Sequence, residues 1–200
     1  MDTLQSVALA AGLAWGSGIR LYAVLFIAGL MARLGYVELP PGLGLLTHPA
    51  VLSASGFMLF IEFFADKIPG IDSLWDAAHT FVRIPAGALL AALALADQDP
   101  ALVLAAAILG GSLASAVHLT KTGSRALINA SPEPFSNWTA SFGEEALLLG
   151  GLWAAFTHPL VFLAGLAIFL LVALWLLPKI WRGLRVVWRG LRAVLSRQRP

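Results

Sequence analysis

Apolar residues gather into seven stretches, which Pro, Gly or charged residues separate. None of the stretches alternates with a period of two, the pattern of a membrane-spanning strand. Helices are the other structure that satisfies every backbone polar group in lipid, so the pattern predicts helices throughout. The stretches are Leu4–Trp15, Leu21–Leu34, Pro49–Ala65, Ile84–Ala96, Ala101–Leu119, Glu145–Phe156 and Pro159–Leu177.

The first two stretches are short for separate membrane spans. From Leu4 to Leu34 a single helix would be about 46 Å long at about 1.5 Å per residue. That is too long for one span and too short for two comfortable ones. Because Gly16-Ser17-Gly18-Ile19-Arg20 lies in the middle, we expect two short tilted helices or a re-entrant hairpin with a polar tip. Either arrangement returns the chain to the side from which it came.

Composition identifies the class of protein. Hydrophobic residues make up 59% of the 200 residues and charged residues only 12%, whereas a soluble domain has about 45–50% and about 25%. The sequence therefore predicts an all-α integral membrane protein without a separate soluble domain. Cysteine is absent, and so are the usual nucleotide, metalloprotease and hydrolase motifs, so we expect no metal and no cofactor.

Short motifs recur along the chain. The motif Thr47-His48-Pro49 recurs at Thr157-His158-Pro159. The Gly-x-Arg motif at Gly18-Ile19-Arg20 recurs at Gly123-Ser124-Arg125. This predicts two similar three-helix halves, a plan that many transporters share. We divide the chain into a first half (1–75), a linker helix region (76–100), a second half (101–178) and a tail (179–200).

Charge is distributed unevenly. From Lys179 onward there are seven basic residues and no acid, whereas residues 1–178 hold six basic residues and eleven acids. The positive-inside rule then predicts an external N-terminus, a cytoplasmic C-terminus and parallel halves. If the linker did not cross the membrane, the halves would be inverted. With parallel halves, five further basic residues share the cytoplasmic side: Arg20, Lys67, Arg83, Lys121 and Arg125.

A polar run, Glu62–Thr80, follows the third apolar stretch. Pro69-Gly70 predicts a turn, after which Asp72 can cap a new helix. Asp72, Asp76, His79 and Arg83 would share one face of that helix. This face could be the solvated side of an interfacial helix, the polar lining of a cavity, or a site for a hard divalent cation.

A second polar run, Asn129-Ala130-Ser131-Pro132-Glu133-Pro134-Phe135-Ser136-Asn137, contains two prolines, which predict a turn or an extended segment. Together with Glu62–Thr80 it resembles a bacterial integral membrane family catalogued only as a domain of unknown function. The resemblance covers about residues 10–177. It implies a small polytopic membrane protein and no established activity.

Glu62 lies among apolar residues, where an isolated carboxylate costs about 2.5–3.5 kcal/mol on insertion scales. Glu62 either lies at a helix end close to water or forms a functional ion pair, for which Arg20 and Arg125 are the partner candidates. These arginines, each in a Gly-x-Arg motif, are suited to binding phosphate or carboxylate, or act as topology anchors. We expect Glu62, Asp66 or Glu145 within salt-bridge reach of one of them.

The second half adds further polar candidates. Ser141-x-x-Glu144 matches a capping box, which gives Glu144 a capping role and leaves Glu145 facing the bundle. His48-Pro49 and His158-Pro159 are expected to begin helices. Within the tail, residues 179–196 are expected to form one basic amphipathic helix outside the bundle. Residues 179–199 would bind anionic inner-leaflet lipids rather than nucleic acid.

The function that these features favour is transport or flipping of a small anionic solute or a phosphorylated lipid across a bacterial inner membrane. A membrane-embedded enzyme acting on a lipid head group, with Asp76 and His79 as acid and base or as metal ligands, is the first alternative, and a non-catalytic scaffold is the second. A homo-oligomer is possible in each case. The candidate substrate-binding residues are Arg20, Lys67, Lys121, Arg125 and Asn129, and the candidate coupling residues are Glu62, Asp66, Asp72, Asp76, His79 and Glu145.

Overall fold

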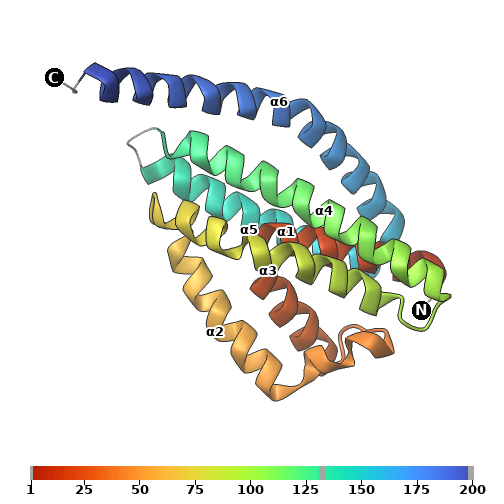
Figure 1. Cartoon of the computed structure of the whole chain (residues 1–200). Helices are drawn as coiled ribbons and strands as arrows, with labels where there is room; N and C mark the ends of the chain where they lie inside the picture. The colour runs from red at the N-terminus through yellow and green to blue at the C-terminus, as the bar shows by residue number, and fades with distance from the viewer. Residues whose placement is uncertain (1, 131–133, 198–200) are drawn as a thin grey trace.

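The computed structural model describes residues 2–130 and 134–197 and folds them into six α-helices and one 3-10 helix (Figure 1). These residues contain no β-strand, which confirms the all-α prediction. In chain order the elements are α1 (Thr3–Arg33), η1 (Pro41–Thr47), α2 (Pro49–Ala65), α3 (Ile71–Ala94), α4 (Pro100–Ile128), α5 (Pro134–Thr157) and α6 (Pro159–Arg197).

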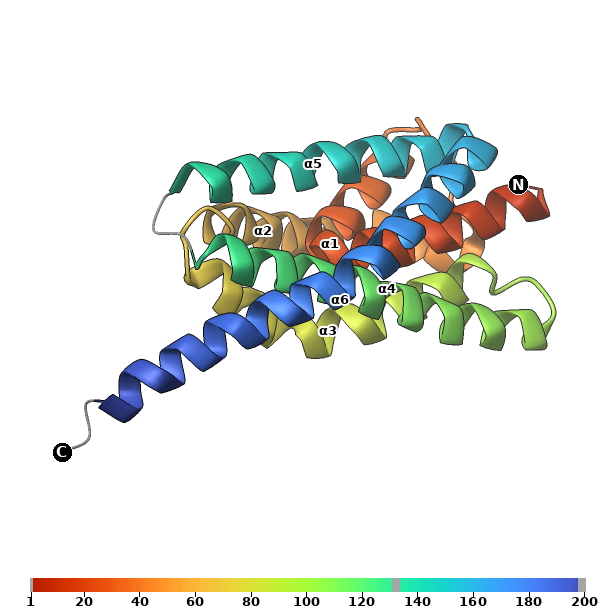
Figure 2. The same ribbon diagram turned by 90° about the horizontal axis from the view of Figure 1, so that it is seen from above.

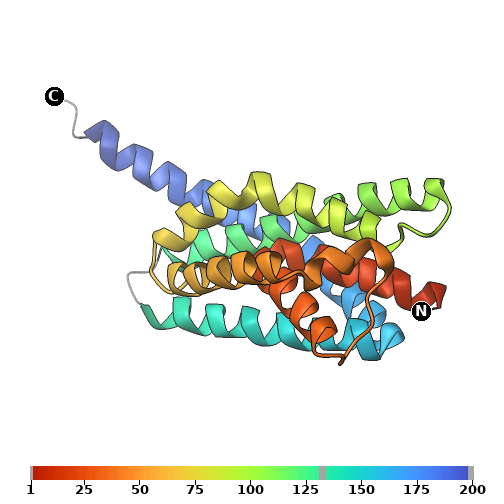
Figure 3. The same cartoon turned by 90° about the horizontal axis from the view of Figure 1, so that it is seen from below.

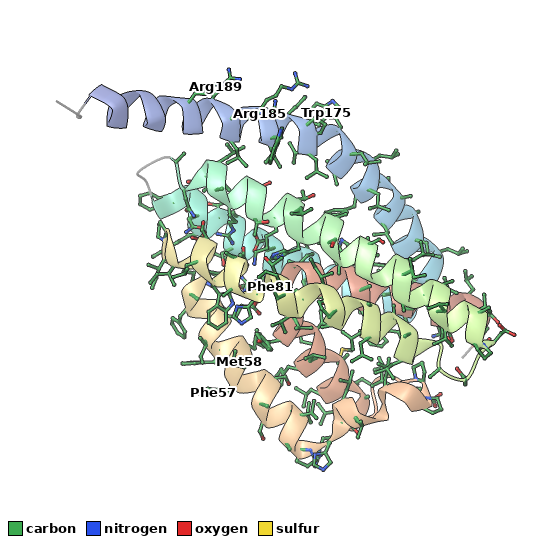
Figure 4. All side chains as sticks on the ribbon, viewed as in Figure 1. Phe57, Met58, Phe81, Trp175, Arg185 and Arg189 are labelled. Carbon is green, nitrogen blue, oxygen red and sulfur yellow. The ribbon has the colours of Figure 1, made fainter. Side chains whose placement is uncertain are left out.

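The surface of this bundle is apolar. Four helices are long and apolar enough to cross a membrane, and α2 makes a fifth with η1, from which it is bent by 67°. Phe57 on α2 and Trp175 on α6 point away from the bundle (Figure 4) and are 65% and 63% exposed. Large aromatic side chains that are exposed on several helices of a bundle indicate a surface in contact with lipid. The chain is therefore a multi-pass membrane protein, as its composition predicts.

The first helix turns back on itself at Arg20. The backbone of Arg20, with φ −150° and ψ 90°, lies outside the helical region and divides α1 into a first arm (3–19) and a second arm (21–33). The arms are so close that a Cβ added to Gly16 would lie 2.6 Å from a methyl carbon of Val24. The prediction that the chain returns to its starting side within residues 4–34 is thus confirmed.

Both arms of α1 lead to one end of the bundle, which we call the N-terminal end (Figures 1 and 3). Gln5 from the first arm and Tyr36, just after the second, line the same small cavity there. From this end α2 to α6 run alternately away and back (Figures 1 and 2). The opposite end, which we call the tail end, holds the α2–α3 turn at 66–70 and the end of α6. The tip of α1 therefore lies inside the bundle.

The first arm of α1 forms the centre of the core. In its most apolar window, 72% of the residues of α1 are buried, against 28% or fewer in α3, α4 and α6. Leu9, Leu13 and Ala14 are fully buried in it. Around this arm α3 and α4 pack through small residues, so that a Cβ added to Gly110 would lie 2.5 Å from the Cβ of Ala91. Such close approach is typical of helices that associate in membranes.

Three predicted boundaries are wrong, each at a proline. The predicted linker helix at 84–96 is part of α3, which continues through Pro85 instead of ending before it. The end of the 129–137 run is helical, because Pro134 begins α5 instead of extending the turn; residues 131–133 lie outside the described part. Pro178 lies inside α6, so residues 179–196 continue the last span. Membrane helices tolerate proline because neighbouring groups satisfy the freed carbonyl.

The tail of α6 leaves the bundle later than predicted. At Gly123, an added Cβ would lie 2.5 Å from Ile180, so the start of the tail still packs against α4. Farther on, α6 extends past the other helices (Figure 2). Arg185 and Arg189 point away from the bundle there (Figure 4). The prediction of a helix is confirmed, and its separation from the bundle starts beyond residue 183.

Both Thr-His-Pro motifs begin helices, as predicted. The backbone N–H of Ala50 donates to His48 Nδ1 over 3.2 Å, which caps α2, and Pro159 is the first residue of α6. In each predicted half a pair of antiparallel segments precedes this helix: the two arms of α1 before α2, and α4 with α5 before α6. The order and direction agree with a duplication, and superposition of the halves stays a prediction.

Candidate functional site

The charged side chains of five helices meet in one buried cluster near the tail end, around the tip of α1. It contains five basic and six acidic residues, each within 4.0 Å of an opposite charge, and none of these side chains is more than 24% exposed. We call it the ion cluster. Its members are Arg20, Lys67, Arg83, Lys121, Arg125, Glu62, Asp66, Asp72, Asp76, Glu144 and Glu145.

Asp66, at the C-terminus of α2, connects the two halves. Its Oδ2 lies 2.8 Å from Arg20 Nη2 and 3.3 Å from Lys121 Nζ. This confirms the predicted salt bridge between Arg20 and an acid. Burial alone would raise the pKa of the Asp66 carboxyl, but Lys121 and Arg20 hold that pKa below its ordinary value. The contribution of the Asp66 carboxylate to folding stability is therefore complete above its pKa in the unfolded chain, about 3.9. This contribution is lost as the pH falls through the lowered pKa of the folded state.

Glu62 pairs with Arg83 and not with the predicted Arg20 or Arg125. Arg83 Nη2 donates to Glu62 Oε1 over 2.5 Å, and its Nη1 donates to Asp76 Oδ1 over 2.6 Å. All three side chains are fully buried. An unpaired charge in this position would cost several kcal/mol, so the guanidinium between two carboxylates is what allows Glu62 to lie inside the bundle.

Arg125 holds the start of α5. Its Nε and Nη2 donate to the two carboxylate oxygens of Glu144 over 2.8 and 3.0 Å, and its Nη1 donates to both oxygens of Asn137. The predicted capping box is wrong, because Ser141 lies inside α5. Its hydroxyl accepts a hydrogen bond from Arg20 Nη2 over 2.8 Å. Glu144 is thus a bidentate partner of arginine.

Two candidates from the polar runs bind each other at the edge of the cluster. Asn129 Nδ2 donates to Asp72 Oδ1 over 2.7 Å and to Asp72 Oδ2 over 2.9 Å. Asp72 also accepts from the backbone N–H groups of Gly70 and Ser73, which fixes the start of α3. The predicted capping by Asp72 is wrong, because Gly70 is the N-cap of α3 and Asp72 lies within its first turn. Asn129, a predicted substrate-binding residue, is therefore already engaged in joining α3 to α4.

Lys67 and Glu145 form the most open part of the ion cluster. Lys67 Nζ lies 3.1 Å from Glu145 Oε1 and 3.1 Å from the centre of the Phe63 ring. Glu145 Oε1 is also 3.4 Å from Arg20 Nη2, a longer contact than that of Arg20 with Asp66. Glu145 is 24% exposed and Lys67 15%, whereas Arg20 is 1% exposed. This ion pair is the easiest to open.

Besides the uncharged Asn129, His79 is the predicted site residue that the ion cluster leaves out. Its Nδ1 lies 2.8 Å from the backbone oxygen of Trp75, and its ring stacks on the Trp75 ring. Asp76 points instead to Arg83 and Lys121. The described residues contain no group of three or more histidines and acids placed to hold a metal ion. The face that was predicted to present Asp76 and His79 together does not do so.

Sequence reasoning missed Asn137 and Ser141 as contributors and gave Glu144 the wrong role. The three residues are spaced at four and three positions, which places them on one helix face once α5 is known to begin at Pro134. The signal was present, but the two nearby prolines led to the prediction of a turn.

A cavity of about 380 Å³ lies between α2 and α5, next to Arg20 and Glu145 of the ion cluster. The second arm of α1 also lines it, and in the described part of the chain no Cα atom of α2 lies within 8 Å of one of α5. Arg20 and Glu145 form its polar end, and the rest is apolar. The lining residues are Arg20, Ala23, Ile27, Gly56, Leu59, Phe60, Phe63, Glu145, Leu148 and Leu149.

Arg20 is incompletely paired. Its Nη2 contacts Asp66 and Ser141, but its Nε and Nη1 are buried and have no hydrogen-bond partner among the described residues. A guanidinium has five donors in a fixed fork that matches carboxylate or phosphate. Arg20, which lines the polar end of the α2–α5 cavity, therefore has unused donors.

Comparison with known proteins gives a family without an assigned activity. No curated protein and no solved structure matches the chain. The family model described as "Domain of unknown function (DUF4126)" matches residues 7–179, which cover the five helices that supply the ion cluster and the membrane-crossing part of α6. This agrees with the resemblance noted in the two polar runs, and the chain belongs to the DUF4126 family.

Proposed function

We propose that this protein is a transporter or flippase that moves a small anionic solute or a phosphorylated lipid across the bacterial inner membrane. The observation that carries the proposal is Arg20, buried at the break of a re-entrant helix with unused donors. Transporters bind ligands at such breaks, near the middle of the membrane and between repeated halves. Arg20, Lys67, Lys121 and Arg125 are the proposed anion-binding residues.

The charges at the two ends of the bundle support a cytoplasmic tail end. The N-terminal end holds the acids Asp2, Glu38, Asp97 and Asp99 and one base, Arg33. The tail end holds Lys67 and the basic tail. By the positive-inside rule the tail end faces the cytoplasm and the N-terminus faces out. The exposed arginines of the tail are then placed to bind anionic lipids of the inner leaflet.

The near balance of charge in the ion cluster supports ion-coupled movement. Six carboxylates neutralise five cations inside the bundle, so an anion can bind Arg20 only if a carboxylate leaves or takes up a proton. Glu145 is the candidate, since it is the most exposed of the three carboxylates within 4.0 Å of Arg20. As the halves move, the remaining charge would be redistributed over the other candidate coupling residues of the ion cluster, which are Glu62, Asp66, Asp72 and Asp76.

The geometry favours transport over the alternatives. A lipid-head-group enzyme would need Asp76 beside His79, but the Asp76 carboxylate is held by Arg83 and Lys121. A scaffold would carry its polar residues at the rim, whereas the side chains of Arg20, Glu62 and Arg83 are at most 1% exposed. Burying eleven charges has a large desolvation cost, which a purely structural role would avoid with apolar residues.

Transport is testable with the purified chain in phosphatidylcholine vesicles under a proton gradient. One assay follows uptake of radiolabelled inorganic phosphate, and a second follows leaflet exchange of fluorescent phosphatidate. We expect protein-dependent movement in at least one assay and a loss of about tenfold or more in Arg20→Gln. Arg33→Gln, on the same helix at the N-terminal end, is the matched control and should retain activity.

The outcome that overturns the proposal is movement no faster than in protein-free vesicles in both assays. Arg20→Lys keeps the charge but loses the fork, so it separates anion binding from folding. A normally folded Arg20→Lys protein with full activity would remove Arg20 from the proposed mechanism.

A further inference from the structure

The cavity between α2 and α5 opens sideways, toward the position of lipid chains. Its walls are apolar, and Phe60 and Leu149, which line it, are 63% and 53% exposed. Figure 3 views the face on which α2 and α5 run next to each other. The ion cluster closes the inner end of the cavity with Arg20 and Glu145. A ligand that fills this space therefore needs an apolar body beside a charged group.

The free donors of Arg20 define that charged group. The two unpaired donors, Nε and Nη1, flank Nη2, which contacts Asp66, Glu145 and Ser141. A two-point contact with phosphate uses Nη2 together with Nε or Nη1, so the phosphate must replace one of the contacts of Nη2. A phosphate monoester carries about −1.5 to −2 charges and three acceptor oxygens, so it can contact Lys67 as well.

Glu145 is the group that such a phosphate would displace. It lies 3.4 Å from Arg20 and is the most exposed acid of the ion cluster. Lys67, 3.1 Å away, can keep Glu145 as a partner after the displacement. Asp66 remains on Arg20 Nη2, so the arginine stays anchored when Glu145 leaves.

On this basis we propose that the ligand is a lipid phosphate monoester that reaches Arg20 from the bilayer through the α2–α5 cavity. The phosphate takes the place of the Glu145 carboxylate at the guanidinium of Arg20, and the first part of the acyl chain lies over the second arm of α1. The inference rests on the proposed function and narrows its substrate from anions in general to a membrane lipid.

The test is binding of fluorescent dioleoyl phosphatidate to the full-length protein in detergent, followed by anisotropy. Fluorescent phosphatidylcholine with the same chains is the lipid control, and inorganic phosphate is the aqueous competitor. Leu149→Trp fills the cavity from α5, and Leu147→Trp, half-exposed on the same helix outside this cavity, is its matched control. Leu59→Phe on α2, with Met58→Phe as its control, repeats the test from the other wall.

We expect phosphatidate to bind at least about tenfold more tightly than phosphatidylcholine. A cavity-filling variant should weaken phosphatidate binding by about tenfold, and its control by less than about twofold. Equal binding of both lipids, or equal effects of cavity-filling and control variants that elute as folded protein, would overturn the proposal. Arg20-dependent binding of inorganic phosphate that both cavity variants leave unchanged would overturn the lipid ligand yet leave anion transport standing.

Discussion

At the scale of single residues, the ion cluster shows how charge is accommodated inside a membrane bundle. Arg83 lies between Glu62 and Asp76, and Asp66 lies between Arg20 and Lys121. Each fully buried charge thus has a partner from another helix. Because breaking one pair leaves an uncompensated charge, these contacts act as cross-links between helices.

The pair between Glu62 and Arg83 gives a quantitative prediction. Glu62→Gln should lower stability by about 3 kcal/mol, because a buried guanidinium loses one of its two carboxylates. Adding Arg83→Gln should recover part of that loss, since the remaining charge is then removed. Melting temperatures of the purified proteins in detergent measure both effects. Glu38→Gln, exposed at the N-terminal end, is the control; equal shifts for Glu62→Gln and Glu38→Gln would contradict the pairing.

The sequence predicted which residues form the site better than it predicted their partners. Glu62 was expected to need a cation because of its apolar surroundings, and this follows from the residue alone. That the cation is Arg83 depends on how α2 and α3 are rotated against each other, which no local pattern contains. His79 shows the converse. Its spacing from Asp76 places both residues on one helix face, but its ring stacks on Trp75 and does not join the ion cluster.

At the scale of elements, the two helix starts at Thr-His-Pro could be predicted, whereas the start of α5 and the continuation of helices through proline could not. His48-Pro49 and His158-Pro159 mark starts because capping and the fixed φ of proline are local properties. Pro85 and Pro178 lie inside helices because packing and lipid sustain the helix beyond them. The break at Arg20 follows the Gly16–Arg20 run, whose small residues allow the two arms to approach.

That close approach predicts a large effect of adding a side chain at Gly16. In Gly16→Leu the new Cβ would lie 2.6 Å from a Val24 methyl and 2.9 Å from Leu148. Overpacking of this kind costs about 1–3 kcal/mol. Gly150→Leu on α5 meets nothing within 4 Å and is the matched control. A lower melting temperature in Gly16→Leu alone is expected; an unchanged one would mean that the arms separate without penalty.

At the scale of the whole molecule, the structure surrounds a central re-entrant hairpin, α1, with the helices α2 to α6. The first arm of α1 is the most buried helix, and its tip brings Arg20 to the ion cluster from the N-terminal end. The lipid-facing helices then form a shell around it. In this arrangement a movement of the second half relative to α1 would change the partners of Arg20, which is what alternating exposure of an anion site requires.

The path of α1 makes a prediction about topology that the absence of native cysteine makes simple to test. Single cysteines are introduced at Thr3 and Tyr36, on either side of α1, and at Gly70 in the α2–α3 turn; all three positions are exposed. Because α1 turns back at Arg20, Thr3 and Tyr36 lie on the same side of the membrane and Gly70 on the other. A membrane-impermeant maleimide added to intact cells should label the first two positions and spare the third. After permeabilisation all three should react, which controls for access. Labelling of Thr3→Cys with protection of Tyr36→Cys would mean that α1 crosses the membrane, and Arg20 would then lose its place at the tip of a hairpin on which the anion site depends.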